Sequence, residues 1–252
     1  MKTRLVSFMV IGLLVISGGI SADTRSADQR VRDGFEYYRG KSSEAAVEMI
    51  IHRPDWRREM KMTAWTRGDA DSLIRIESPA RDKGNGTLKT GKDMWMYNPK
   101  INRVIKLPPS MMSQAWMGSD FSNNDLAKTD SILNDYTHTL DKTEEVDGKQ
   151  VYWIKSMPRP DAPVIWGMQR IAVREDDIIL AQEFYDEDLE LVKSMRCYDI
   201  KMMGDRLYPV KWRMKKADAG DSYTELIYTE LRFMDTLSST IFTVSNLKNP
   251  RR

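Results

Sequence analysis

The sequence predicts a mainly β protein, built as a single curled antiparallel sheet with a few helices covering its concave face. Apolar and polar residues alternate with period two over most of the chain after Gly40, which is typical of half-buried antiparallel strands. Turn signals recur at hairpin spacing, most clearly at Asp147-Gly148. An antiparallel sheet with this many strands tends to curl, and a curled sheet has a concave face that helices can cover.

The N-terminus has the order of a secretory signal peptide. Lys2 and Arg4 precede an apolar run from Leu5 to Ile16, and Ser21-Ala22 provide small residues at a cleavage point. This run is shorter than the roughly 20 apolar residues of a membrane-spanning helix. We therefore predict a signal peptide over residues 1–22, with a retained N-terminal anchor as the alternative.

Removal of the signal peptide leaves a chain with balanced charge. Two basic residues and no acidic residue are lost, so the 39 basic residues fall to 37, which equals the 37 acidic residues. A balanced surface has no general attraction for nucleic acid. Cys197 is the only cysteine, so no internal disulfide can form. We predict a periplasmic protein, soluble after cleavage, with one domain over residues 23–252 and no nucleic-acid partner.

A first helix is predicted directly after the signal peptide. Ser26 and Gln29 have the spacing of a capping box, and Gly40 stands where the helix would end. The apolar residues that recur at helical spacing are Val31, Phe35 and Tyr38.

Strands follow the helix. In Trp56–Thr66, one face carries Met60, Met62 and Ala64, and the other face is mostly polar. The remaining predicted strands are Leu73–Glu77, Thr87–Thr90, Met94–Tyr97, Arg103–Leu107, Thr137–Val146, Val151–Met157, Gln169–Arg174, Ile178–Tyr185, Leu191–Lys201, Leu207–Lys215 and Tyr223–Phe233.

The segment after Pro108-Pro109 interrupts the strand pattern. Ser110 can cap a short helix that ends at Gly118, and Ser122 can cap a second one, with Asp125 three residues further on. We interpret this segment as a helical excursion inserted between strands.

The sequence shows no catalytic or metal-binding constellation. The histidines are His52 and His138, and the nearest candidate nucleophile, Ser119, does not lie in a G-x-S-x-G elbow. Cysteine and histidine do not recur with metal-ligand spacing, and no glycine-rich phosphate loop follows a strand. We therefore predict no enzymatic activity, no metal and no cofactor.

Methionine and tryptophan are the most informative residue types, with 17 and 7 copies. Methionine side chains are flexible and polarizable, so surfaces rich in methionine adapt to ligands of varying shape. The alternative is that these residues simply fill the core. Our hypothesis assigns lipid contacts on the inner face of the sheet to Met60, Met62, Met94, Met96 and Trp212, and on the helical excursion, acting as a lid, to Met112, Trp116 and Met117.

Residues 93–126 contain two motifs that resemble a known family. A W-x-Y-x-P strand is formed by Trp95, Tyr97 and Pro99, and a G-S-D-F sequence covers Gly118, Ser119, Asp120 and Phe121. Both resemble the outer-membrane lipoprotein-sorting protein family, in its LolA-like branch of largely uncharacterised periplasmic proteins. We interpret the second motif as structural: Gly118 ends a helix, Asp120 bonds backbone groups in the turn, and Phe121 anchors the loop.

The resemblance implies both a fold and a function. Members of this family have an unclosed half-barrel sheet whose hollow is covered by helices, and the founding carrier holds the acyl chains of lipoproteins in that hollow. It implies a lipid-binding domain here, with a lipid or an acylated protein as cargo, an inner-membrane transporter as donor and an outer-membrane acceptor. Because an exposed acyl chain costs roughly 0.8 kcal/mol per methylene, a carrier needs an apolar cavity.

Two other function classes stay open at the level of the sequence. One is a lipid esterase or phospholipase-type enzyme, which would use Ser119 and a histidine. The other is a periplasmic module that binds an envelope protein or senses lipid without transporting it.

Overall fold

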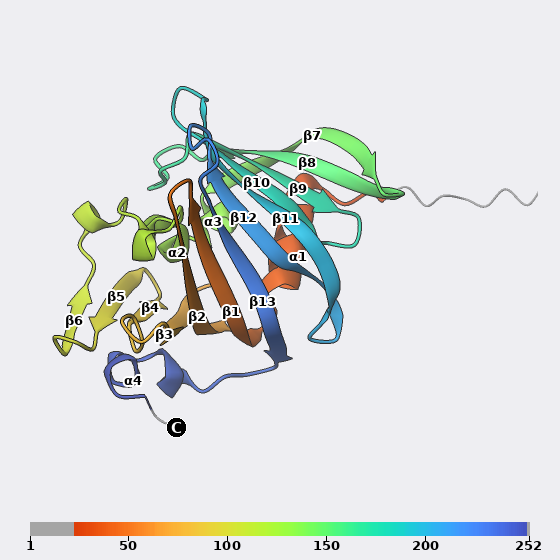
Figure 1. Ribbon diagram of the computed structural model, residues 1–252. Helices are drawn as coiled ribbons and strands as arrows, with labels where there is room; N and C mark the ends of the chain where they lie inside the picture. The colour runs from red at the N-terminus through yellow and green to blue at the C-terminus, as the bar shows by residue number, and fades with distance from the viewer. Residues whose placement is uncertain (1–22, 251–252) are drawn as a thin grey trace, which may run out of the picture.

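The described part of the chain, residues 23–250, folds around one antiparallel sheet of 13 strands in this computed structural model (Figure 1). The predicted signal peptide, residues 1–22, lies outside the described residues. The spatial order of the strands is β6-β5-β4-β3-β2-β1-β13-β12-β11-β10-β9-β8-β7. Their bounds are β1 (Ser42–Arg53), β2 (Trp56–Arg67), β3 (Asp71–Ser78), β4 (Gly86–Thr90), β5 (Asp93–Asn98), β6 (Arg103–Lys106), β7 (Tyr136–Val146), β8 (Lys149–Pro158), β9 (Met168–Arg174), β10 (Ile179–Tyr185), β11 (Leu191–Met203), β12 (Arg206–Lys216) and β13 (Tyr223–Met234).

The strand order determines where the connections run. The first strand, β1, lies in the middle of the sheet and pairs with β2 on one side and with the last strand, β13, on the other. Strands β1–β6 build one half of the sheet and β7–β13 the other, so the chain must pass from the edge at β6 to the opposite edge at β7. We call the connecting residues, 107–135, the crossing segment; they pack on the concave face. The predicted curled antiparallel sheet is confirmed.

Helix α1 and the helical turns of the crossing segment lie on the concave face, as predicted. Helix α1 (Ala27–Arg39) begins after Ser26, whose hydroxyl accepts the backbone N–H of Gln29, and it ends at Gly40, which has a left-handed φ of 61°. Only half of the predicted capping box forms, because the Gln29 side chain donates to Asp33. The other helical elements are η1 (Pro109–Met111), η2 (Trp116–Gly118), α2 (Asn123–Ala127), α3 (Ser131–Asn134), η3 (Ser239–Phe242) and α4 (Val244–Lys248).

The crossing segment differs from the predicted pair of helices. The helix expected after Ser110 is replaced by two single turns, η1 and η2, because Met117 and Gly118 both adopt left-handed backbone, with φ of 52° and 75°. The backbone N–H of Trp116 donates to the carbonyl of Phe121 at 2.7 Å, and this bond closes a tight loop. The second predicted helix is confirmed as α2.

Strand β1 is missing from the predicted strands, although it is the central one. Ala45, Val47, Met49 and Ile51 are buried on its concave side. The residues at positions 44, 46 and 48 on its other face are half-buried, so the alternation is present. The glutamates and alanines at positions 44–48 are, however, good helix formers, and local sequence therefore does not mark this strand.

The apolar core lies mainly on the concave face, in two adjoining clusters that share Tyr38, Leu226 and Tyr228. On the convex face, the C-terminal elements η3 and α4 pack over β3–β5 through Phe242 and Leu247. Across residues 23–250, none of the helices has the length and apolar character needed to cross a lipid bilayer.

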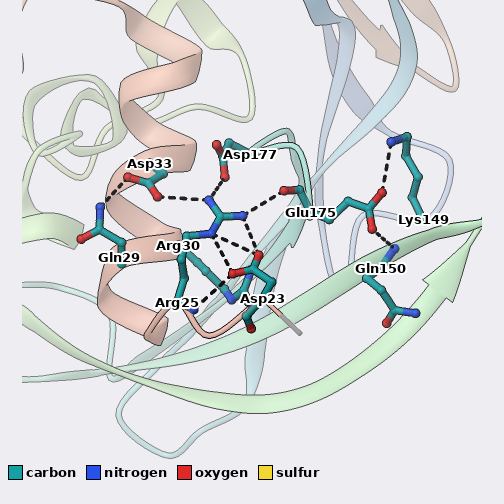
Figure 2. Close-up of polar contacts among 9 residues, drawn as sticks. All are labelled: Asp23, Arg25, Gln29, Arg30, Asp33, Lys149, Gln150, Glu175 and Asp177. Atoms are coloured by element: carbon teal, nitrogen blue, oxygen red, sulfur yellow. Dashed lines mark hydrogen bonds and ion pairs between the residues drawn. The ribbon is translucent and has the colours of Figure 1, made fainter. Parts of the chain in front are cut away.

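A network around Arg25 fixes the start of α1 to the turn between β9 and β10 (Figure 2). The guanidinium of Arg25 forms an ion pair with Asp177, donates to the carbonyl oxygen of Glu175 at 2.9 Å and donates to Asp33 at 3.1 Å. It also donates to Asp23 at 2.8 Å, and this hydrogen bond is the main reason why the pKa of Asp23 lies well below its usual range. The network therefore joins the residues before α1, the helix itself and the β9–β10 turn.

Arg30 adds a buried contact to the same region. Its side chain is 4% exposed and donates to Asp23 at 2.8 Å. Its guanidinium carbon lies 3.4 Å from the centre of the Tyr152 ring on β8. This cation–π contact links α1 to β8, in the half of the sheet formed by β7–β13.

We expect Arg25→Ala to lower the free energy of unfolding by about 1–3 kcal/mol, because several partly buried charge-assisted hydrogen bonds are lost together. Urea unfolding followed by circular dichroism measures this change. Arg57→Ala is the matched control, because Arg57 pairs with Glu59 on an exposed surface, and it should cost less than about 0.5 kcal/mol. Equal effects of both variants would show that the network adds nothing.

A buried histidine–serine pair joins β7 and β8. His138 is 9% exposed, and its Nδ1 lies 2.9 Å from the hydroxyl of Ser156, which is fully buried. Burial disfavours the imidazolium form and lowers the pKa of His138 below its ordinary value of 6.5, while Asp28 acts weakly in the opposite direction. The folded protein thus holds this ring neutral near neutral pH.

We expect acid to destabilise the folded protein through His138. Because the pKa is lower in the folded than in the unfolded chain, stability falls as the pH drops from about 6.5 through the lowered pKa, by at most about 1.4 kcal/mol per pH unit. His138→Gln retains hydrogen-bonding groups and should remove this component. Urea unfolding at several pH values measures it, and identical pH slopes for the two proteins would refute it.

Candidate functional site

A cavity of about 290 Å³ lies between the concave face of the sheet, α1 and the crossing segment. This volume is close to the lower end of the roughly 300–1,000 Å³ of small-ligand pockets. Most of its wall is apolar or aromatic. The apolar and aromatic lining residues are Phe35, Tyr38, Val47, Met62, Ala64, Trp65, Ile74, Trp116, Phe121, Leu126, Ile132, Tyr136, Ile165, Trp166, Phe184, Met195, Met214, Leu226 and Tyr228.

Stacked tyrosines stiffen the part of the wall nearest to α1. The ring of Tyr208 stacks on Tyr38 with centroids 5.4 Å apart and meets Tyr228 edge-on at 5.2 Å. The hydroxyls of Tyr38 and Tyr228 are hydrogen-bonded to each other, and the Tyr208 hydroxyl donates to the Tyr38 carbonyl at 3.3 Å. Burial raises the pKa of all three phenols, so they stay neutral. Tyr38 and Tyr228 line the cavity.

Trp116 closes the cavity from the side of the crossing segment. It is 3% exposed, and its indole N–H donates to the hydroxyl of Thr87 on β4 at 3.0 Å. The hydroxyl of Ser119 donates to the Trp116 carbonyl at 2.7 Å and accepts the N–H of Phe121 at 3.2 Å. Ser119 therefore shapes the loop that places Trp116 over the sheet.

Asp120 anchors the crossing segment to the rim of the sheet. Its carboxylate is 4% exposed and accepts two N–H groups of Arg53, at 3.0 and 3.1 Å, and the hydroxyl of Thr224 at 2.6 Å. The prediction that Asp120 bonds backbone groups in its own turn is wrong. Its partners come from β1 and β13, far away in sequence, so local turn chemistry could not identify them.

A polar group interrupts the apolar wall near α2. Asp125, the third residue of α2, completes the predicted capping box with Ser122 and forms an ion pair with Lys193 of β11. Gln182 donates to the side-chain oxygen of Gln169 at 2.7 Å on the neighbouring strands. Asp125, Gln169 and Gln182 all line the cavity.

The structure places some of the predicted lipid-contact residues at this cavity. Met62 and Trp116 line it directly. Met60 is buried beside them in the same cluster as Trp116. Trp212 lies in the adjoining cluster, where its indole donates to the Pro209 carbonyl at 2.8 Å. Met60 and Trp212 thus pack beside residues that line the cavity.

The other predicted lipid-contact residues lie away from the cavity. Met94 and Met112 belong to a cluster that the crossing segment covers near the β5–β6 edge, and Met96 packs both there and against the cluster of Trp116. Met96 and Met117 line a second hollow, of about 460 Å³, at that edge. The alternation of β5 puts Met94 and Met96 on one face, but sequence could not show that the crossing segment rests on them.

The two motifs occupy structural positions around the cavity. Trp95 and Tyr97 face the convex side, against η3 and α4, and Pro99 begins the β5–β6 turn. Gly118 has a φ of 75°, a conformation that glycine adopts without strain. Phe121 both anchors its loop in a cluster with Phe184 and Met214 and reaches the cavity wall.

Several wall residues were not predicted. Leu226 and Tyr228 of β13 line the cavity, as do Met195 of β11 and Met214 of β12. Because Leu226 and Tyr228 are two residues apart, the period-two pattern could have put them on one face. Which face is concave depends on how the whole sheet curls.

The reactive side chains of the described chain are engaged elsewhere. His52 stacks on Tyr223 with centroids 4.6 Å apart, and His138 is bonded to Ser156. Burial raises the pKa of the Cys197 thiol to about 11, so the thiol is protonated at neutral pH. Among residues 23–250, no group of three His, Cys, Asp or Glu side chains could hold a metal ion.

The half-barrel with its covered apolar cavity is the LolA-like class of fold. A family model described only as an uncharacterized protein matches residues 68–249. This match covers more than half of the chain, so the chain belongs to that family. No protein of curated function is similar to the chain in sequence.

Solved structures show the same fold. A DUF1329 family protein from Desulfovibrio piger is 23% identical with a TM-score of 0.78, over 88% of this chain and 97% of that chain. A domain assigned as an outer membrane lipoprotein-sorting protein, from Vibrio parahaemolyticus, is 23% identical with a TM-score of 0.77, over 88% and 98%. A LolA superfamily protein from Nitrosomonas europaea is 21% identical with a TM-score of 0.73, over 88% and 99%.

We expect Asp120→Asn to loosen the crossing segment, because the guanidinium of Arg53 loses its charged partner in a largely buried site. The free energy of unfolding should fall by about 3 kcal/mol, and amide hydrogen exchange should rise most in residues 115–126. Asp93→Asn removes one partner of the exposed Lys106–Asp93 pair and serves as control. Unchanged exchange in residues 115–126 would argue against an anchoring role for Asp120.

Proposed function

We propose that this protein is a periplasmic carrier that holds the acyl chain of a lipid or an acylated protein in the cavity beneath the crossing segment. The observation that carries the proposal is the cavity itself: it is lined mainly by apolar and aromatic side chains and formed by a sheet that remains open at β6 and β7. Two of the similar structures support it, because one is assigned to lipoprotein sorting and one to the LolA superfamily.

The energetics of acyl transfer agree with this site. A chain of about ten methylenes loses on the order of 8 kcal/mol when it leaves a bilayer for water, and an apolar wall compensates that loss. A cavity of about 290 Å³ accepts part of a long chain. Full occupancy therefore requires the crossing segment to shift, and this segment is anchored by the side chains of Asp120 and Asp125.

The predicted signal peptide supports a periplasmic location, in which the carrier would load at an inner-membrane transporter and unload at an outer-membrane acceptor. A non-enzymatic role is part of the proposal. It is supported by Ser119, whose hydroxyl is committed to the loop around Trp116. Absence of hydrolysis of short-chain esters and phospholipids would agree with it, and hydrolysis that is lost in Ser119→Ala would favour an esterase.

Native mass spectrometry of the protein purified from a periplasmic extract tests the proposal, followed by organic extraction of anything bound. We expect co-purifying phospholipid or acylated peptide. Transfer of a labelled lipid from donor to acceptor vesicles then separates a carrier from a module that only binds. A clean apo mass with no uptake from vesicles would reject lipid carriage.

Within the crossing segment, lipid uptake should fall when Trp116 is replaced by aspartate and stay unchanged when Met117 is replaced. Trp116→Asp places a charge in the apolar wall and should reduce lipid uptake at least about tenfold, because a buried unpaired carboxylate is strongly disfavoured. Met117→Asp is the matched control, since Met117 faces the second hollow and its left-handed backbone tolerates aspartate. Circular dichroism should show an intact β signal in both, and equal losses of uptake would refute the assignment of the cavity.

A further inference from the structure

One carboxylate oxygen in the cavity wall has no hydrogen-bond partner. The Oδ2 atom of Asp125 is fully used: it accepts the backbone N–H of Ser122 at 2.7 Å and its hydroxyl at 2.9 Å, and it forms the ion pair with Lys193. The Oδ1 atom is buried and receives no donor. The side chain is 8% exposed and lines the cavity. A buried acceptor without a donor is costly, so this atom marks a place where a ligand donor would be stabilised.

The surroundings of Asp125 favour an uncharged ligand group. Lys193 is 5% exposed and already neutralises the carboxylate, and its ammonium lies 5.0 Å from the ring centre of Trp166 and 5.3 Å from that of Phe184. Both rings line the cavity, so they separate the ion pair from solvent. The side-chain amides of Gln169 and Gln182 add uncharged polar groups to the same wall. The site therefore offers hydrogen bonds without net charge.

We infer that the polar end of the ligand carries a neutral hydrogen-bond donor, a hydroxyl or an amide N–H, that binds Oδ1 of Asp125 while the acyl chain occupies the apolar part of the cavity. This inference rests on the lipid-binding function proposed above and specifies its ligand class. The hydroxyl would come from a glycerolipid or another lipid alcohol, and the N–H from an amide-linked acyl chain.

Arg39 is the competing polar group in the same cavity. Its Nη2 atom is buried without a partner, and an anionic head group could bind there. Its other guanidinium nitrogens, however, donate to the carbonyl of Gly68 and the hydroxyl of Thr129. Burial lowers the pKa of Arg39, and the nearby carboxylates of Asp69 and Asp130 act in the opposite direction. An anionic ligand at Arg39 would lie in the field of these two carboxylates, so we assign the polar end of the ligand to Asp125.

Matched ligand pairs test the inference on the unmodified mature protein, by displacement of the neutral fluorescent probe N-phenyl-1-naphthylamine. Dodecanol should displace the probe at a concentration about tenfold lower than dodecyl methyl ether, and dodecanamide about tenfold lower than its N,N-dimethyl derivative, because only the first of each pair can donate to a charged acceptor. The pair with the larger ratio identifies a lipid alcohol or an amide-linked chain as the source.

A double variant, Asp125→Asn/Lys193→Met, removes the ion pair without leaving either charge unpaired. The asparagine oxygen replaces Oδ2 as acceptor for Ser122, so its amide nitrogen replaces Oδ1 and presents a donor. Affinity for the ethers should change by less than about twofold, and the preference for donors should disappear. Asp93→Asn, which removes one partner of the exposed Lys106–Asp93 pair outside the cavity lining, is the control and should retain that preference.

Three outcomes separate this inference from the proposed function. Equal affinities within both pairs would overturn the inference and leave lipid binding intact. Tighter binding of dodecanoate than of dodecanol would overturn it in favour of an anion at Arg39. Failure of every ligand to displace a bound probe would reject the lipid-binding function itself. If the double variant does not fold, the ligand pairs on the unmodified protein still decide.

Discussion

The architecture depends on one constraint: the chain must pass from the edge strand β6 to the opposite edge strand β7, over the concave face of the sheet. The first strand is central and pairs with the last one. Both edge strands therefore come from the middle of the sequence, where residues 107–135 connect them. This crossing segment covers apolar side chains that the curled sheet would otherwise expose. Its backbone polar groups are satisfied by short turns, such as the bond from Trp116 to Phe121, and not by a long helix.

Charged contacts contribute to where the crossing segment docks. Asp120 binds Arg53 at the rim of the sheet, and Asp125 binds Lys193 deeper inside. Buried ion pairs are weak contributors to net stability because desolvation opposes them, yet each one is strongly disfavoured if a partner is missing. Only one placement of the segment satisfies both pairs. That placement sets the volume of the cavity and puts Trp116 into its wall.

The two sequence motifs stabilise the framework around the cavity and supply little of its wall. Trp95 and Tyr97 face the convex side and pack with the C-terminal elements, which stiffens the β3–β5 half of the sheet. The G-S-D-F loop orients Trp116 through Ser119 and anchors the crossing segment through Asp120. The cavity wall comes largely from residues outside both motifs, such as Tyr38 and Leu226.

The sequence by itself determined the fold class, α1, α2 and most strands, because alternation, caps and turn residues act over a few neighbouring positions. It also placed Met62 and Trp116 at the site. It did not reveal β1, whose glutamates and alanines favour a helix, or the packing of Met94 and Met96 under the crossing segment. The pairing of Asp120 with Arg53 and of Asp125 with Lys193 was equally hidden. These features depend on which face is concave and on contacts between distant strands, and only the tertiary structure decides both.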